Sequence, residues 1–255
     1  MMSFFNKNIS RKIANQKLET KLLLSTIGID LLFLFFFLVA AFSIITSRYH
    51  KLLYQSMQSS SSLVSYEFTN RLEDLVTMTN IVRSDSTVQS TLDEIYQPQE
   101  DYAVHYYSDI YSALQKHYLE YRQPYLKMAA ISCPRFITYT NENIACRPDA
   151  DLTKELIALA EAGEGSPVWV TSHAEDHGIF LVREIKKIKN LRLDNLGTLI
   201  INVNLGDLVM EMSKISNEYK DSYWIIYEKD QPLFSSPELD TEEVQKINDK
   251  IKSYA

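Results

Sequence analysis

The chain has 255 residues, of which 26 are Lys or Arg and 33 are Asp or Glu, and its net charge is −7. From Tyr49 onward, 20 basic residues stand against 31 acidic ones, with no run of like charge. Binding to a phosphate backbone needs a cationic face, so we expect no nucleic-acid partner.

The first predicted element is a hydrophobic helix at residues 22–47. Asp30 is the only charged residue in this segment. As a helix the segment would be about 39 Å long, more than the roughly 30 Å hydrocarbon layer of a membrane. Core helices rarely stay apolar over such a length, so the segment predicts one transmembrane helix. Asp30 would lie about one helical turn inside the hydrocarbon layer, where its carboxylate either reaches the interface or is protonated. The alternative is a functional acid within the membrane.

Basic residues set the expected orientation of this helix. Only Arg48 and Lys51 follow it closely, whereas five cations precede it: Lys7, Arg11, Lys12, Lys17 and Lys21. The bias predicts a cytoplasmic tail at residues 1–21 and an extracytoplasmic region at residues 48–255 of a cell-membrane protein. A cleaved signal peptide is the competing interpretation, with small residues at Val39 to Ala41, but the apolar region starts late and is too long.

Residues 48–97 are predicted to form a stalk helix. Side chains spaced by three, four or seven residues share one face, interrupted only by Arg71: Met57, Ser61, Val64, Phe68, Leu75, Met78 and Val82. Continued from Arg48 to Val82, the helix would be about 52 Å long. Its apolar face can pair with a second copy of the chain, giving a homodimer, or pack against the chain's own second helix.

That second helix is predicted at residues 101–122, where the region from 98 to 221 begins. Seven tyrosines lie between Tyr102 and Tyr125, several of them on one helical face before Pro124. An aromatic ligand cage is one interpretation of these tyrosines. Packing of an amphipathic helix against a sheet or another helix is the simpler one.

The pattern then changes to the alternation that is typical of strands. The expected order is strand, strand, helix, strand, strand, strand, at residues 125–132, 135–140, 151–162, 166–172, 178–187 and 197–204. Consecutive strands joined by short turns pair antiparallel. The order therefore predicts an α+β fold with one antiparallel sheet of about five strands and helices packed on it.

Three further elements are expected after this sheet. A helix fits residues 205–216, a hairpin fits residues 223–236, and a helix that Asp240 can cap fits residues 240–253. The hairpin restarts the strand pattern, yet only 34 residues follow Asp221. We therefore expect residues 222–255 to be the start of a second, incomplete module.

Three segments carry a resemblance to a known family. They are YEFTNRLEDLVTMTNIVRSD at residues 66–85, LGTLIINVNLGDLVMEM at residues 196–212 and YWIIYEKDQPLFSS at residues 223–236. In layout the chain from residue 22 onward resembles the extracytoplasmic double-Cache sensor region of Gram-positive-type sensor histidine kinases. The resemblance implies a PAS-like, membrane-distal Cache domain at residues 98–221, a membrane-proximal module at residues 222–255, and a small-molecule or cell-envelope ligand.

The catalytic half of such a kinase is not recognised in this sequence. The family continues with a second span, a linker, a histidine-bearing helix and an ATP-binding domain. After Ser47 the longest apolar run is about five residues, and six glycines leave no nucleotide-binding loop. We therefore assign no catalytic residue and no cofactor, and expect the chain to be the amino-terminal half of a two-component signalling protein.

Ligand-binding residues are proposed from the resemblance, which places a ligand between the sheet and the segments that cover it. The candidates are polar or aromatic side chains on strands and their connections: Arg135, Tyr139, Trp169, Asp176 and Arg183. An arginine beside an aromatic wall suits a molecule that carries a carboxylate. The motif of amino-acid-binding members is not matched in order or spacing, so an amino acid is not the favoured ligand.

Two further constellations are candidate chemical sites. His173 and His177 have the spacing of metal ligands on a helix, but they fall in a turn between strands, and no metal site is assigned. Cys133 and Cys146 enclose twelve residues, so a disulfide is possible in an exported domain. Two reduced, buried thiols are the alternative, because the expected hairpin register separates the two residues.

The sequence thus favours a membrane-anchored sensor input for signal transduction. The input half of a chemoreceptor or of a cyclic-dinucleotide enzyme is the alternative within signalling. A single-span scaffold or adhesion protein is the alternative from another class. No nucleophile, base and orienting acid can be placed together, which disfavours a hydrolase.

Overall fold

The computed structural model describes residues 18–96, 103–140, 146–173, 178–189, 192–214, 223–228, 231–237 and 239–252. The chain divides into two compact units, Met1–Leu63 and Val64–Ala255. Asp176 and His177, which the sequence analysis singled out, lie outside the described residues.

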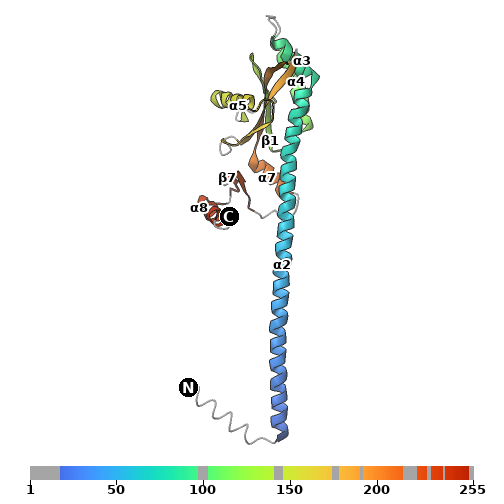
Figure 1. The fold of residues 1–255 in the computed structure, drawn as a ribbon, viewed down its shortest axis with the longest axis vertical. Helices are drawn as coiled ribbons and strands as arrows, with labels where there is room; N and C mark the ends of the chain where they lie inside the picture. Colours follow the sequence, from blue (N-terminus) through green and yellow to red (C-terminus); the bar gives the residue numbers. More distant parts are fainter. Residues whose placement is uncertain are drawn as a thin grey trace. The chain divides into compact units, whose positions relative to one another are not determined.

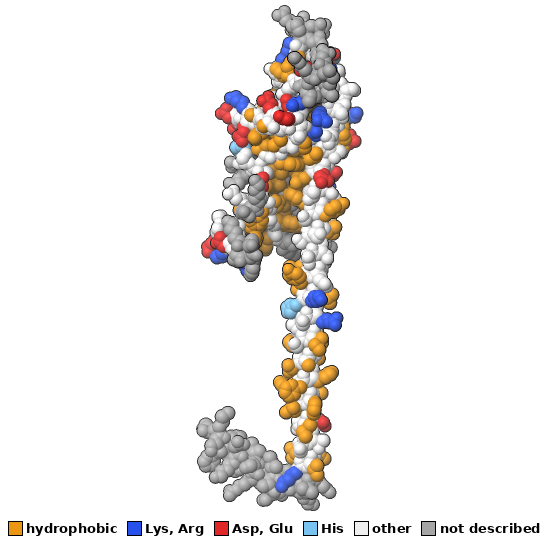
Figure 2. Space-filling model, in the orientation of Figure 1, with side chains coloured by type: hydrophobic (Ala, Val, Ile, Leu, Met, Phe, Trp, Pro, Cys, Tyr) orange, Lys and Arg blue, Asp and Glu red, His pale blue; other side chains and the backbone are white. Residues whose placement is uncertain are grey.

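The first unit contains most of helix α2, which runs from Leu18 to Ser84. Hydrophobic side chains cover the surface of its apolar segment (Figure 2). No residue in the most apolar part of the helix is buried, and Phe37, for example, is 73% exposed. Such exposure does not suit the core helix of a soluble domain. The predicted transmembrane segment therefore lies in a helix that is long and apolar enough to cross a membrane.

The second unit is built on one five-stranded sheet. Every neighbouring pair in the order β2-β1-β5-β4-β3 is antiparallel. The strands are β1 (Leu126–Ser132), β2 (Ile137–Tyr139), β3 (Val168–Val170), β4 (Ile179–Lys189) and β5 (Arg192–Val203). The predicted α+β class and the antiparallel sheet are confirmed.

Helices flank the sheet, and a small second sheet follows it. The helices are α3 (Ser86–Ile95), α4 (Ala103–Glu120), α5 (Ala150–Ala162), α7 (Leu205–Ser213) and α8 (Thr241–Lys252). Strands β6 (Ile225–Glu228) and β7 (Gln231–Ser235) pair antiparallel as the expected hairpin. The stalk helix, expected to continue to residue 97, instead ends at Ser84, because Asp85 caps a new helix, α3.

Alternation along the strands gives the sheet two apolar faces. Ile131, Leu181 and Ile201 belong to a core cluster that includes side chains of α2, α3, α4 and α7. Phe180 and Ile200, one position away, belong to a second cluster with α5. Figure 1 shows α5 on one side of the sheet, and α3 and α4 on the other.

The apolar face of α2 within the second unit packs into the first of these clusters. Leu75, Met78 and Val82 are buried there beside residues of α3, α4 and the sheet. Met57, which lies in the first unit, is 64% exposed. The predicted stripe therefore has two parts, a buried part that includes Val64 and the residues from Leu75 to Val82, and an exposed part around Met57.

The tyrosines of α4 and its surroundings behave as packing residues. Tyr106 and Tyr125 are buried in the core cluster, and Tyr118 and Tyr121 pack against it. Tyr107 is more exposed and meets the ring of Phe136 edge to face at 5.5 Å. The amphipathic interpretation of these residues therefore agrees with the structure.

Gly178, at the start of β4, occupies a position that only glycine suits. Its φ is +82°, and a Cβ atom there would lie 2.5 Å from the carbonyl oxygen of Val203. We expect Gly178→Ala to lower the free energy of unfolding by about 1–3 kcal/mol, measured by urea denaturation of the detergent-solubilised chain. Gly28→Ala is the matched control, because nothing lies within 4 Å of a Cβ atom there. Equal stability of the two variants would contradict the strained close approach.

Candidate functional site

The four sequence-predicted ligand residues that the structure describes do not converge on one pocket. Trp169 on β3 and Arg183 on β4 face the side of the sheet that α2 covers. Tyr139 on β2 packs in the cluster on the α5 side, with the guanidinium of Arg147 4.6 Å from the centre of its ring. Arg135 lies exposed in the turn between β1 and β2. These residues therefore belong to at least three different surroundings.

Arg183 is a buried arginine that joins the centre of the sheet to α2. Its Nη1 donates hydrogen bonds to Thr79 Oγ1 at 2.9 Å and to Asn80 Oδ1 at 2.6 Å, both on α2. Its Nε donates to the carbonyl oxygen of Gly165, in the turn after α5, at 2.8 Å. One side chain thus connects β4, α2 and the turn after α5.

The charge of Arg183 has no carboxylate partner among the described residues. All of its hydrogen-bond partners are neutral oxygen atoms, and the residue is 7% exposed. Burial, and secondarily the charge of Arg83, lowers the pKa of Arg183 below its ordinary value. An arginine still keeps its proton in such surroundings, so the junction holds a fixed, dehydrated positive charge.

Further polar contacts join β4 to α3. Lys187 of β4 binds Asp93 of α3, with 2.6 Å between Nζ and Oδ2. The side-chain amide of Gln89 donates to the carbonyl oxygens of Arg83, at 2.7 Å, and Lys186, at 3.5 Å. The last turns of α2 and the whole of α3 are therefore connected to one central strand.

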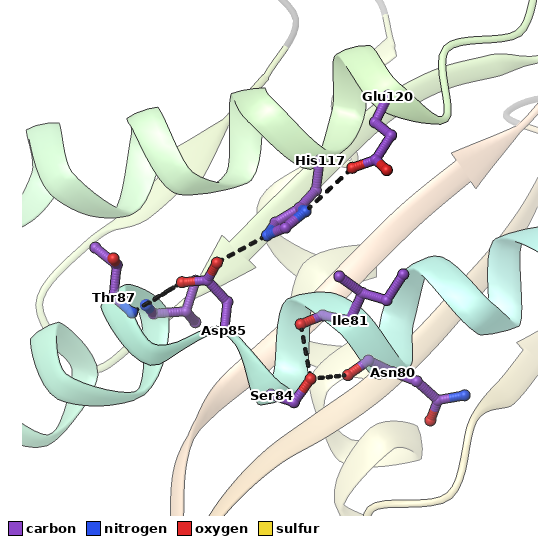
Figure 3. A network of polar contacts seen from close by, with 8 residues as sticks. Asn80, Ile81, Ser84, Asp85, Thr87, His117 and Glu120 are labelled. Carbon is purple, nitrogen blue, oxygen red and sulfur yellow. Dashed lines mark hydrogen bonds and ion pairs between the residues drawn. The ribbon is translucent and has the colours of Figure 1, made fainter.

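Asp85 organises the break between α2 and α3. Its Oδ1 accepts hydrogen bonds from the backbone N–H groups of Thr87 at 2.8 Å and Val88 at 3.1 Å. Its Oδ2 lies 2.9 Å from Nε2 of His117 on α4 (Figure 3). Burial alone raises the pKa of Asp85, but the bonds from His117 and from the two N–H groups outweigh burial, so the pKa lies below its ordinary value. The carboxylate thus caps α3 and binds α4 in its charged form.

A cavity of about 510 Å³ lies where α7 begins and the second sheet approaches. Apolar side chains and polar atoms share its wall, and among the described residues no charged side chain lines it: Gly178, Asn204, Leu205, Gly206, Pro232, Leu233, Phe234, Ser235, Leu239, Thr241 and Val244. Such a lining suits a small, largely uncharged organic molecule. Of the predicted ligand residues that the structure describes, none lines this cavity.

The cavity is made by residues that sequence reasoning did not group together. Asn204 caps α7, since its Oδ1 accepts a hydrogen bond from the backbone of Asp207 at 2.9 Å. Phe234 comes from β7 and lies close to Gly206. The sequence Asn-Leu-Gly after the last strand could have indicated the start of a helix. Its proximity to β7 depends on tertiary packing and could not be predicted from the local sequence.

No protein-family model matches the chain, and no curated protein matches it either. The two features that the geometry of the described residues offers are the cavity and the polar junction of β4 with α2 and α3.

The histidine pair between β3 and β4 is described only in part. Nε2 of His173 lies 3.2 Å from Oε2 of Glu155, so this histidine contacts α5. Among the described residues, no three His, Cys, Asp or Glu side chains gather as metal ligands.

The two cysteines are separate thiols in the structure. Cys133 packs with the α2 side of the sheet and donates a hydrogen bond from Sγ to the carbonyl oxygen of Phe136 at 3.3 Å. Cys146 packs with the cluster on the α5 side. Because the two thiols lie against opposite faces of the sheet, a disulfide between them would require the chain to move.

Proposed function

We propose that the chain is the membrane-anchored, extracytoplasmic sensor region of a two-component histidine kinase. The observation that carries the proposal is the continuity of α2. One helix contains an exposed apolar segment of membrane-spanning length and, further along, the turns that pack into the core of an α+β sheet domain. A ligand-dependent change in that domain would act directly on a helix that continues into the membrane.

The second part of the proposal is the Cache-like identity of the domain. The antiparallel sheet with helices on both faces has the layout that the resemblance implies. The hairpin β6–β7 and α8 would be the start of a membrane-proximal module at residues 222–255. The hydrogen bond between Thr171 Oγ1 and Glu228 Oε2, at 2.5 Å, joins the two sheets and would couple these modules.

The mechanism requires two states of the sheet domain that differ in ligand affinity. A small molecule in the cavity would contact Asn204 and Leu205 at the end of β5 and the start of α7. β5 pairs with β4 along its whole length, and β4 carries Arg183 and Lys187, which bind α2 and α3. This route connects the cavity to the helix through paired strands and named hydrogen bonds.

We also propose that the protein works as a homodimer through the exposed part of α2. Large apolar side chains are exposed on this part: Tyr49, Leu52, Leu53, Tyr54, Met57 and Leu63. The core part of the stripe is already used within the chain, so pairing between copies would use residues 49–63. Helix pairing of this kind buries apolar surface that is otherwise solvated.

Membrane orientation is tested by cysteine labelling in intact cells. With Cys133 and Cys146 replaced by serine, we expect a membrane-impermeant maleimide to label Ser59→Cys and not Ser3→Cys. Labelling of Ser3→Cys alone would reverse the orientation, and recovery of the protein from the medium would identify the apolar segment as a cleaved signal.

Ligand binding is tested by thermal unfolding of the full chain in detergent micelles against a library of small metabolites. We expect at least one compound to raise the midpoint in a saturable way, and Gly206→Leu, which fills the cavity beside Phe234, to abolish the rise. Met210→Leu, on the exposed side of α7, is the control. A rise that survives Gly206→Leu would move the ligand to another site, and no rise with any compound would favour a scaffold or adhesion protein.

A further inference from the structure

His117 is almost completely buried, and one of its ring nitrogens has no partner. Its side chain is 5% exposed, and Nδ1 makes no hydrogen bond among the described residues. Oε2 of Glu120 lies 3.9 Å from Nδ1, beyond hydrogen-bond distance. Figure 3 shows the imidazole between the carboxylates of Asp85 and Glu120. A buried polar atom without a partner destabilises a fold, so this nitrogen calls for a physical explanation.

The protonation state of the ring decides how well its surroundings suit it. A carboxylate only accepts hydrogen bonds, so Nε2 of His117 carries a proton toward Asp85 in either state. In the neutral ring, Nδ1 is then an acceptor that faces another acceptor, the carboxylate of Glu120. In the charged ring, Nδ1 gains a proton, and two carboxylates flank one cation.

The other charged groups near α4 are engaged elsewhere. α4 packs against α3, β1 and β2 and shares the core cluster with α2, whose Arg83 lies near the charge of Arg183. The charged or titratable side chains of those elements have partners, face away or are exposed: Asp93 with Lys187, Lys127 with Asp207, Tyr139 on the α5 side of the sheet, and Glu94 in solvent. Of the carboxylates in the described part of the chain, only Asp85 and Glu120 lie within 4.0 Å of a His117 ring nitrogen. These two groups therefore respond most directly to the charge on the ring.

We propose that His117 is a proton-dependent clamp that holds α4 to the junction of α2 and α3. The charged ring binds Asp85 as an ion pair and attracts Glu120. The neutral ring keeps one hydrogen bond and leaves Nδ1 unpaired. Since histidine is the side chain whose charge ordinarily changes near neutral pH, the clamp loosens as the medium becomes alkaline.

Asp85 sets the acidic limit of the clamp. Because its pKa is lowered in the folded chain, the carboxylate contributes stability above its unfolded pKa of about 3.9 and loses it as the pH falls through the lower, folded value. The clamp therefore weakens at the acidic limit, where Asp85 takes up a proton and the ion pair is lost.

A double-mutant cycle on the full chain in detergent micelles tests the clamp. Asp85→Asn removes the charge and keeps a good helix cap, and His117→Gln removes the ionisable ring. We expect the coupling between the two positions, measured from urea unfolding, to change the folding equilibrium constant about tenfold at about pH 5.5 and only about twofold at about pH 8. A coupling that is equal at the two pH values would overturn the proposal.

His105→Gln is the matched control, because His105 lies on the same helix, is 72% exposed and faces Asp109 at 3.7 Å. We expect it to leave the pH dependence of unfolding unchanged, and an effect as large as that of His117→Gln would contradict the clamp. If His117→Gln does not fold, amide hydrogen exchange at Thr87 and Val88 decides the question. After correction for intrinsic rates, raising the pH should reduce protection about fivefold more in the wild type than in Asp85→Asn. Equal changes would overturn the proposal.

Discussion

Leu75→Ala is expected to lower the free energy of unfolding of the sheet domain by about 2–5 kcal/mol. Leu75 is 1% exposed and lies in the core cluster with residues of α3, α4 and the sheet. Truncation to alanine removes buried apolar surface and leaves a cavity that close packing of the cluster cannot fill. Urea denaturation of the detergent-solubilised chain, followed by the fluorescence of Trp169 and Trp224, measures the loss.

Met57→Ala is the control for this prediction, because Met57 lies on the same predicted stripe but is 64% exposed. We expect a change within about 0.5 kcal/mol in the same experiment. If the homodimer proposal holds, Met57→Ala also weakens cross-linking between copies while the fold is unchanged. A large loss of stability from Met57→Ala, or none from Leu75→Ala, would show that the division of the stripe between core and exposed parts is wrong.

The sheet domain could be predicted because its signals are local. Alternating apolar residues and short turns indicated which segments are strands, and all of these segments belong to one antiparallel sheet. The pairing of β1 with β5 was not predicted, because it joins segments that are far apart in the sequence. The break at Asp85 was missed because apolar spacing on both sides of it is helical. Asp85 ends α2 through its bonds to Thr87, Val88 and His117, and the last of these partners is 32 residues away in sequence. Periodicity carries no information about such a partner.

The candidate site was harder to predict because residue type does not reveal which face of the sheet a side chain occupies. Trp169 pairs with Leu181 and faces the α2 side, whereas Tyr139 pairs with Ala130 and faces α5. Only the register of the assembled sheet separates them. The cavity at α7 could not be predicted from the sequence for a related reason. Gly178 and Val244, which both line it, come together only through tertiary packing.

Arg183→Met is expected to lower the free energy of unfolding by about 2–4 kcal/mol. Methionine fills a similar volume but cannot donate, so the carbonyl oxygen of Gly165 and the side chains of Thr79 and Asn80 lose their shared donor. Removal of a buried charge offsets part of this loss. The cost of leaving three acceptors unpaired is larger, so the net change is a loss of stability. Urea denaturation gives the magnitude, and hydrogen exchange of the α2 amides around Thr79 shows where the loss falls.

Two variants separate the donor geometry of Arg183 from its charge. Arg183→Lys keeps the charge but cannot reach three acceptors with a planar fork, so we expect it to recover less than half of the lost stability. Arg122→Met, at an exposed position after α4, should change stability by no more than about 0.5 kcal/mol. If Arg183→Met is as stable as the wild type, the hydrogen bonds to α2 only balance the burial of the guanidinium. The proposed signal from β4 to α2 would then need a different physical link, and the contacts of Lys187 and Gln89 with α3 would be the next to test.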